Sequence, residues 1–491
     1  CDMLGSARWV GELAQRYPAR EITPLTPWFA NISIHDVEIT GCSTLVDVSA
    51  LPEKPVKNFF FGNVKAHCDR IGKICDATKF SMKDVRIESC DTVMRIDNCD
   101  YASFFGFSNV TTGSSVKIEK TGGECRYLNV QTYPLVPVNY QSIRPGEVWL
   151  DTEGKPIQAH GFQVTFREGK YYWYGEDKTH TLFGTNRMFG GVRCYSSTDF
   201  YNWKDEGRII EPATDPHSPL HHCQKLERPH ILYCAKTGRY VCWLKSQSND
   251  GHFVILEAEH FMGPYHFVRN LKPNGFAVGD FDMYADSDTG KGYVWFERPH
   301  WEQICAELSD DYTNVNGRYS EHFVGKVPPF TREAAAHFVM DGKHYIYTSG
   351  TTSYTPNPSE VAVFDDYHGE YTVLGNPHIG DEYAHSFCSQ ITSVIKIPGK
   401  DLYVAMADRW LPHTNKTDIP KKDWQSFLTR YKDHRPYPKD FATPKVADRF
   451  YTLVNPNQDV YKATYVFLPI VVKDGIPMIE WKDEWKLENY E

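Results

Sequence analysis

The sequence IQAHGFQVTFREGKYYWYGEDK, residues 157–178, determines the architecture that we predict for most of the chain. Two runs rich in aromatic and β-branched residues, Gln163 to Arg167 and Tyr171 to Tyr174, flank the dipeptide Gly169-Lys170. Such runs are typical of β-strands, and a glycine between them adopts the positive φ of a tight turn at little cost. We therefore predict a β-hairpin here.

A turn of the same kind recurs four more times, each time before an aromatic strand, and the five glycines are separated by 69, 52, 52 and 57 residues. The later turns are Gly238-Arg239-Tyr240, Gly290-Lys291-Gly292-Tyr293, Gly342-Lys343-His344-Tyr345 and Gly399-Lys400-Asp401-Leu402-Tyr403. Five hairpin-centred units of this size match the four-stranded blades of a propeller. We predict an all-β fold with a five-bladed β-propeller over residues 136–491. A β-sandwich is the weaker alternative, because its strands need not share one turn.

The end of the chain is expected to complete the ring of blades. The last predicted strands run from Ala463 to Val472 and from Met478 to Trp485. They follow a long segment, Leu411 to Pro456, that is rich in Lys, Asp and Pro. We interpret this segment as a surface excursion.

Residues 1–135 repeat with a shorter period. Apolar strands recur every 22 to 25 residues, and a polar turn follows each strand. The strands are Ile32 to Ile39, Val56 to Val64, Lys79 to Ile87 and Ser103 to Val110. Cys68 and Cys90 are separated by one such interval, as stacked positions would be. Because a parallel β-helix buries its core by stacking like residues on successive coils, we predict a short, partial right-handed parallel β-helix.

Segments such as NISIHDVEITGC resemble the late β-helix coils of the polygalacturonases of glycoside hydrolase family 28 over roughly residues 20–130. Residues 1–135 contain none of the N-T-D, adjacent D-D, G-H-G and R-I-K motifs that carry the chemistry of that family. We therefore expect this region to be non-catalytic.

Composition and charge exclude several classes of protein. The 491 residues carry 53 Lys and Arg against 63 Asp and Glu, which gives a net charge of −10. An acidic chain without a basic stripe is a poor partner for nucleic acid. The longest apolar runs, such as Tyr465 to Val472, are far shorter than the ~20 residues of a membrane helix. We predict neither a nucleic-acid partner nor a membrane span.

The 13 cysteines are odd in number and form no C-x-x-C pair. The pattern gives no support for a tetrahedral zinc site and favours buried free thiols, with a few disulfides in an oxidising compartment. The sequence opens on Cys1, which is typical either of a lipid-modified mature end or of a cut inside a larger protein. We expect a secreted, periplasmic or cell-surface-attached protein.

Several acidic residues stand close to the starts of predicted blade strands. They are Glu176 in YYWYGEDK, Glu227 in LERPHILY, Asp280 in VGDFDMYAD, Glu297 in VWFERPH and Glu333 in TREAAAHFV. The innermost strands of a propeller begin around a central funnel, so these side chains should converge there. Crowded carboxylates repel one another and keep at least one protonated, as a general acid requires.

The motifs that follow the first hairpin resemble glycoside hydrolase family 43 over about residues 145–488. They include GVRCYSSTDFYNWKDEG, ERPHILYCAKTGRYVCWL, REAAAHFVMDGKHYIYTSG, SQITSV and ADRW. Within that family the chain is most similar to the branch that contains exo-β-1,3-galactanases. The resemblance implies that Glu333 is the general acid, although its EAAA motif lacks the usual proline. It also implies that Asp280 orients this acid and tunes its pKa.

The chain departs from the family pattern at the position of the general base. Most of the family has an aspartate at the opening of the first blade, where this chain reads AHGF, residues 159–162. The galactanase branch shows the same absence, and its proposed base is a glutamine that corresponds to Gln390. Because a neutral amide is a poor proton acceptor, Gln390 would act as an imidic acid or only position water. Gln390 is the first candidate and Glu176 the second.

The resemblance also implies substrate-binding residues. Glu227 and Arg228 can bond vicinal hydroxyls of a sugar, and the face of Trp410 can stack on a pyranose. His160 and Glu297 complete the predicted binding set.

These residues predict an inverting exo-acting glycoside hydrolase that removes terminal sugars, in the first place β-1,3-linked galactose, from plant-type arabinogalactan or pectin side chains. Its partner is a polysaccharide or oligosaccharide. The alternatives are an α-L-arabinofuranosidase or β-galactofuranosidase of the same family, or a catalytically silent glycan-binding propeller. The resemblance implies no redox cofactor and no assigned metal ligands, and it leaves room for a structural cation on the propeller axis.

Overall fold

The computed structural model describes residues 18–126, 128–133, 138–179, 181, 188–247, 251–326, 330–352, 354, 356–410 and 460–491. The chain forms two units. The first ends at Val138 and includes Thr152–Lys155, and the second comprises Asn139–Asp151 and Pro156–Glu491. The predicted insertion Leu411 to Pro456 lies outside the described residues.

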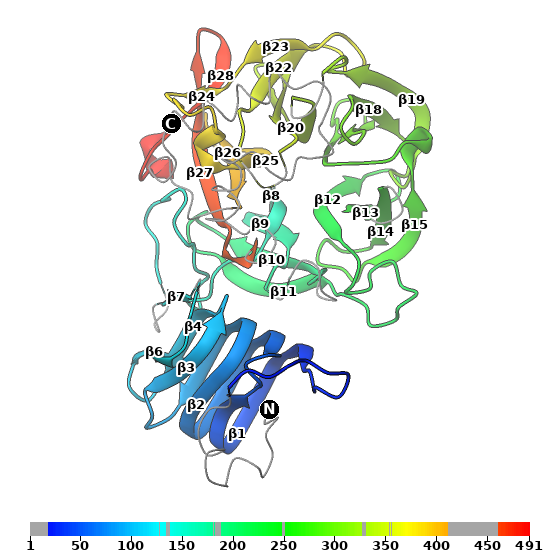
Figure 1. The fold of residues 1–491 in the computed structure, drawn as a ribbon. Coiled ribbons are helices and arrows are strands. Elements are labelled where there is room, and N and C mark those ends of the chain that lie inside the picture. Colours follow the sequence, from blue (N-terminus) through cyan, green and yellow to red (C-terminus); the bar gives the residue numbers. More distant parts are fainter. Residues whose placement is uncertain are drawn as a thin grey trace. The chain divides into compact units, whose positions relative to one another are not determined.

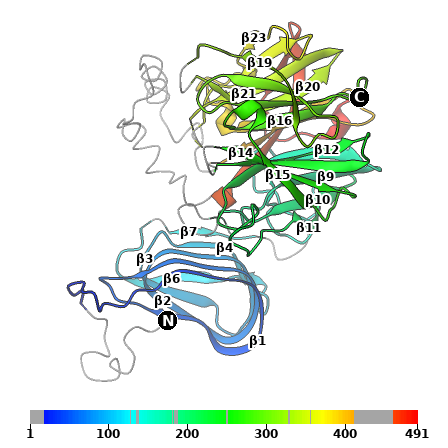
Figure 2. The ribbon, with the colours of Figure 1, turned by 90° about the vertical axis from the view of Figure 1, so that its right-hand side faces the viewer.

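The first unit is a β-solenoid, as predicted. Its strands are β1 (Ala30–Ser49), β2 (Val56–Glu88), β3 (Val93–Asp100), β4 (Ser103–Asn109), β5 (Ser114–Ser115), β6 (Lys117–Gly122) and β7 (Asn129–Gln131). Successive coils pair in parallel, β1 with β2, β2 with β3 and β4, β3 with β6, and β4 with β7. Figure 2 shows these strands following one another along the unit.

The spacing of the coils is less regular than the sequence indicated. Ala30 pairs with Lys57, whereas Ser81 pairs with Ser103, so the interval between stacked residues ranges from 27 to 22 in these two ladders. The cysteine stacked beside Cys68 is Cys42, while Cys90 is exposed and stands outside the described ladders. Stacked apolar side chains, among them Ile74 and Ile96, fill the interior.

The second unit is a propeller of five antiparallel sheets, which Figure 1 shows from cyan to red. Blade 1 contains β8 (His160–Arg167), β9 (Lys170–Glu176), β10 (Val192–Ser197) and β11 (Lys204–Ile210). Blade 2 contains β12 (Leu226–Cys234), β13 (Arg239–Ser246), β14 (His252–Ala258) and β15 (His266–Leu271). Blade 3 contains β16 (Phe281–Ala285), β17 (Gly292–Glu297), β18 (Gln303–Leu308) and β19 (Val315–His322).

Blade 4 contains β20 (Arg332–Met340), β21 (Lys343–Gly350), β22 (Glu360–Phe364) and β23 (Thr372–Gly375). Blade 5 contains β25 (Gln390–Lys396), β26 (Tyr403–Arg409), β27 (Thr464–Lys473) and β28 (Ile476–Glu480), with the two-residue β24 (His378–Ile379) beside β28. The final strand is shorter than predicted, because Trp485 lies beyond it in an isolated bridge with Ile143.

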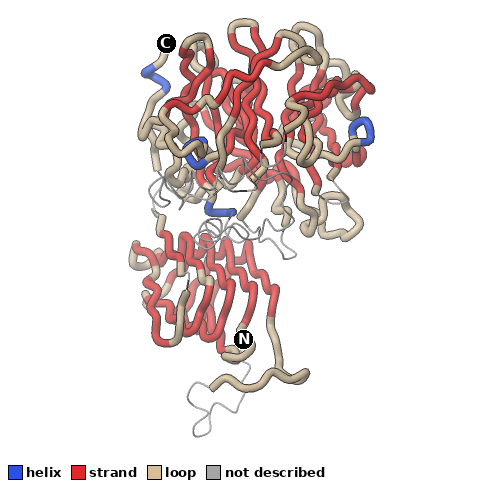
Figure 3. The backbone as a smooth tube through the Cα atoms, turned by 45° about the horizontal axis from the view of Figure 1, so that its top comes forward, coloured by secondary structure: helices blue, strands red, loops and turns tan. Residues whose placement is uncertain are grey.

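The repeated glycine turns lie where the sequence predicted them. Each connects the first and second strands of a blade, and each glycine has a positive φ, from 68° at Gly238 to 79° at Gly169. A residue with a side chain would be strained in this conformation, which explains the recurrence of glycine. Strands dominate the described chain, and its helices are short 3₁₀ turns (Figure 3).

The first strands of the blades, β8, β12, β16, β20 and β25, each contact the next in a closed ring. Each hydrophobic cluster of this unit spans two neighbouring blades. The cluster around Trp173 and Phe467 joins blade 1 to blade 5, so apolar burial closes the ring. No described helix has the length and hydropathy that crossing a membrane requires.

Candidate active site

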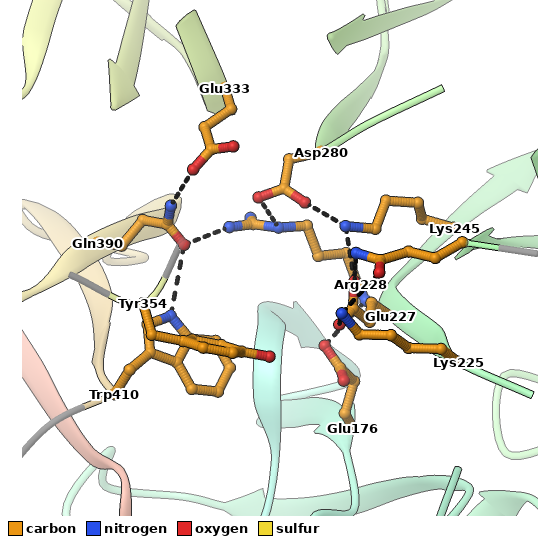
Figure 4. Close-up of a pocket in the computed structure, with 11 residues that line it drawn as sticks. Glu176, Lys225, Glu227, Arg228, Lys245, Asp280, Glu333, Tyr354, Gln390 and Trp410 are labelled. Atoms are coloured by element: carbon orange, nitrogen blue, oxygen red, sulfur yellow. Dashed lines mark hydrogen bonds and ion pairs between the residues drawn. The ribbon is translucent and has the colours of Figure 1, made fainter. Parts of the chain in front are cut away.

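A pocket of about 110 Å³ opens at the starts of the inner strands, and all five blades contribute to it. Its lining residues are Glu176, Lys225, Glu227, Arg228, Lys245, Gln247, Asp280, Glu333, Tyr354, Gln390 and Trp410. Seven of the nine predicted site residues are in this set, and Figure 4 shows how they face one another. The exceptions are His160 and Glu297.

Backbone bulges aim two of these side chains. The register of β12 shifts after Glu227, where Arg228 has a φ of 52°, and the register of β20 shifts after Glu333, where Ala334 has a φ of 48°. A bulge with a left-handed residue bends a strand and redirects the adjacent side chains. The bulge in blade 2 therefore turns Arg228 toward the pocket, and the bulge in blade 4 does the same for Glu333.

Two cations hold Asp280. Arg228 Nε lies 2.8 Å from Asp280 Oδ2, and Lys245 Nζ donates to Oδ1 at 2.6 Å. Lys245 also lies 2.6 Å from Glu227 Oε2. Burial opposes ionisation of both carboxyls, but the surrounding cations outweigh it and lower the pKa of Asp280 and of Glu227. Both groups are therefore carboxylates at neutral pH.

Glu333 has the opposite electrostatic environment. Burial, the negative charge of Asp280 and the carboxyl of Glu297 raise the pKa of Glu333 well above its usual value, and the nearby cations only partly oppose this. The side chain therefore keeps its proton to a higher pH than an exposed glutamate does. A protonated carboxyl that faces a pocket can deliver its proton to a bound ligand.

Gln390 lies beside this acid. Its Nε2 donates to Glu333 Oε1 at 3.2 Å and to Ser349 Oγ at 2.9 Å. Its Oε1 accepts from Arg228 Nη2 at 2.8 Å and more weakly from Trp410 Nε1 at 3.4 Å. The amide thus contacts Glu333 directly and connects it to Arg228.

Glu176 enters the pocket from β9 in blade 1. Its Oε1 accepts the backbone N–H of Arg228 at 3.1 Å, and its Oε2 forms an ion pair with Lys178. Burial raises the pKa of the Glu176 carboxyl, Glu227 adds to the rise, and Lys178 opposes it.

The pocket has an aromatic wall. The rings of Trp410 and Tyr354 meet edge to face with centroids 5.1 Å apart. An aromatic face beside carboxylates and amides is the usual setting for a sugar ring, whose hydroxyls and C–H groups need both kinds of partner.

His160 and Glu297 lie behind the lining residues. His160 Nδ1 is 2.9 Å from Asp408 Oδ1, and both side chains are fully buried. Glu297 is also buried, and its Oε1 accepts the backbone N–H of His300 at 2.8 Å. Burial raises the pKa of the Glu297 carboxyl to about 7. Direct contact with a ligand in this pocket is therefore not supported for His160 or Glu297.

Sequence reasoning missed Lys225, Lys245, Gln247 and Tyr354 as lining residues, and Asp408 as the partner of His160. Lys245 gave the clearest signal, because it is a lysine in the otherwise apolar run YVCWLKS. A buried lysine requires an acidic partner, and the predicted carboxylates were available.

Two groups of side chains within the described ranges resemble metal ligands. His221, His222 and Cys223 bring one ligand atom each within 4.8 Å of one another, in the loop before β12 and outside the lining set. On the inner strands, His230 Nε2 lies 2.6 Å from Gln163 Nε2 and 3.0 Å from Asp282 Oδ1. A cation there would have to replace these mutual contacts.

The pocket of this five-bladed propeller places a glutamate of raised pKa near an aspartate of lowered pKa, and such a pair of carboxyl groups is typical of glycoside hydrolases. Residues 162–394 match the family model of glycosyl hydrolases family 43. The match lies within the propeller and, together with the fold, indicates a glycoside hydrolase.

Solved structures extend this finding. One similar structure is a family 43 β-1,3-galactosidase with galactodeoxynojirimycin, at 27% identity and a TM-score of 0.56 over 70% of this chain and 100% of that chain. A second family 43 β-1,3-galactosidase is 26% identical and has a TM-score of 0.57, and the match covers 72% of this chain and 65% of that chain. An exo-β-1,3-galactanase from Clostridium thermocellum is 25% identical and has a TM-score of 0.53, and the match covers 70% of this chain and 66% of that chain. The match thus spans about two thirds of the length of the last two chains. A search of curated proteins gave no match.

Proposed function

We propose that the protein is an inverting, exo-acting glycoside hydrolase that removes terminal β-1,3-linked galactose from an oligosaccharide or polysaccharide. The observation that carries this proposal is the pair of Glu333 and Asp280 in one pocket, where the pKa of the first is raised and that of the second is lowered. The choice of galactose is supported by similarity to solved galactosidases and a galactanase.

In the proposed reaction Glu333 protonates the glycosidic oxygen as the bond to the anomeric carbon breaks. Burial and the charge of Asp280 raise the pKa of this acid in the resting enzyme, and Arg228 and Lys245 keep Asp280 ionised. Water attacks the opposite face of the ring, which inverts the anomeric configuration. The reaction needs no co-reactant other than water.

Substrate binding would use the remaining groups of the pocket. Arg228 Nη1 is buried and has no hydrogen-bond partner among the described residues, so it is available to a sugar hydroxyl. Glu227 can accept hydroxyl protons, and Trp410 can stack on the apolar face of the ring.

The test is incubation of the full chain with β-1,3-galactan, β-1,3-galactobiose, and arabinofuranosyl and galactofuranosyl substrates. The proposal predicts release of galactose without larger products, first as the α-anomer in proton NMR spectra. Release of pentose alone would assign the protein to the arabinofuranosidases, and release of galactose from galactofuranosides alone to the galactofuranosidases. Binding of oligosaccharides without cleavage of any would leave a glycan-binding propeller.

We further propose that the natural substrate is a plant-type arabinogalactan or pectin side chain, and that the enzyme acts outside the cytoplasm. The family and its galactan-active relatives support this. Growth of the source organism on arabinogalactan, followed by assay of washed cells and medium, would test both points.

A further inference from the structure

Glu176 occupies space that a side chain at position 161 would otherwise fill. Gly161 has a φ of 53°, and a Cβ atom there would lie 2.4 Å from Glu176 Oε1. Its neighbour His160 pairs in register with Glu176 on the adjacent strand. The opening of β8 brings no carboxylate of its own, and β9 inserts one into the volume beside Gly161.

The backbone at this point is held from blade 5. Asp408 Oδ2 accepts the N–H of Gly161 at 2.8 Å, while Oδ1 contacts His160. Asp408 and His160 are both fully buried. Because these contacts keep Gly161 in place, the volume that receives Glu176 is part of the fold.

The environment of the Glu176 carboxyl supports both its ionised and its protonated form. The Lys178 ammonium and the Arg228 N–H stabilise the carboxylate, and burial favours its protonated form. A base whose proton affinity lies above that of an exposed carboxylate is a better acceptor near neutral pH.

Gln390 lacks this capacity. Both hydrogens on its Nε2 are directed to acceptors, Ser349 and Glu333, and its Oε1 receives the Arg228 guanidinium. It also touches Glu333, whereas an inverting enzyme separates its acid and base by ~6.5–9.5 Å to admit the water. In Figure 4 Glu333 and Glu176 enter the pocket from opposite sides.

We propose that Glu176 is the general base and that Gln390 is a positioning residue for Glu333; this rests on the proposed function. Glu176 takes one proton from water as the water oxygen bonds to the anomeric carbon. The bond from that carbon to the leaving oxygen breaks, and Glu333 supplies a proton to that oxygen. Glu176 ends protonated and Glu333 ends ionised, so protons and charge balance.

The test uses the full chain with Glu176→Ala, assayed on β-1,3-galactobiose with and without sodium azide. We expect a loss of kcat of about 10²–10⁴-fold. Azide, a small anion that needs no base, should restore turnover and give α-galactosyl azide, visible by NMR. Glu176→Gln, which keeps the shape of the side chain, should lose the acidic limb of the kcat/KM profile without azide rescue.

Two control variants separate this role from a structural one. Glu227→Ala removes another carboxylate of the same pocket and should raise KM without forming the azide product. Gln390→Ala should alter the alkaline limb of the pH profile, which reports Glu333, and also form no azide product. Azide rescue of Gln390→Ala in place of Glu176→Ala would overturn the assignment, as would an unchanged kcat in Glu176→Gln. A wild type that cleaves no galactoside would instead refute the proposed function.

Discussion

Replacing Lys245 with methionine should destabilise the propeller strongly. The Lys245 ammonium lies 2.6 Å from both Glu227 Oε2 and Asp280 Oδ1, and its side chain is only 7% exposed. Methionine preserves the apolar stem and removes the charge. Breaking a buried ion pair by removing one partner costs about 3–5 kcal/mol. Arg228 remains next to Asp280, so we expect the lower end, about 3 kcal/mol at pH 7.

The loss should depend on pH in a defined direction. The folded pKa values of Glu227 and Asp280 are lowered, so their ion pairs stabilise the fold above the unfolded values, ~4. This stability disappears as pH falls toward the folded values. The difference in free energy of unfolding between wild type and Lys245→Met should therefore be largest at pH 6–8 and decrease below about pH 4.

Urea unfolding followed by tryptophan fluorescence measures this difference, because every described tryptophan except Trp28 lies in the propeller unit. Lys225→Met is the matched control. Lys225 lies 3.4 Å from Glu227 Oε1 with 27% of its side chain exposed, and its removal should cost less than about 1 kcal/mol. A loss below about 1 kcal/mol in Lys245→Met, or an equal loss at pH 4 and pH 7, would refute the assigned ion pairs.

Three further changes test the site. Ala334→Gly should raise the free energy of unfolding by about 0.5–1 kcal/mol in urea titrations, because glycine relieves a φ of 48° at a small entropic cost; a lower stability would contradict the strained bulge. The gain in stability of Glu297→Gln over wild type should be larger at pH 8 than at pH 5. The Glu297 carboxyl has a raised pKa of about 7 in the folded protein, so the wild type loses stability as pH rises between these values and the variant does not. Melting temperatures of both proteins at both pH values check this. Trp410→Ala should raise KM for β-1,3-galactobiose about tenfold and leave kcat within threefold, as loss of one stacking platform implies; a fall in kcat alone would argue against stacking.

The architecture could be predicted from sequence because its signals are local. Each hairpin requires a glycine with positive φ between two aromatic strands, and Gly169 and Gly399 show this at the first and last turns. Carboxylates at the starts of inner strands, such as Asp280 and Glu333, followed from the same repeat. Five similar sheets can bury their apolar faces against one another by forming a ring. The number of repeated turns therefore indicated a five-bladed propeller.

The pairing of charges around the pocket was settled only by tertiary structure. Lys245 meets Asp280 across 35 positions of sequence, and Arg228 meets Gln390 across 162. Such contacts depend on the rotation between blades and on bulges that no local pattern encodes. The same holds for Glu176, whose carboxylate fills the space left by Gly161 on the neighbouring strand, because only packed side chains reveal which volume is vacant.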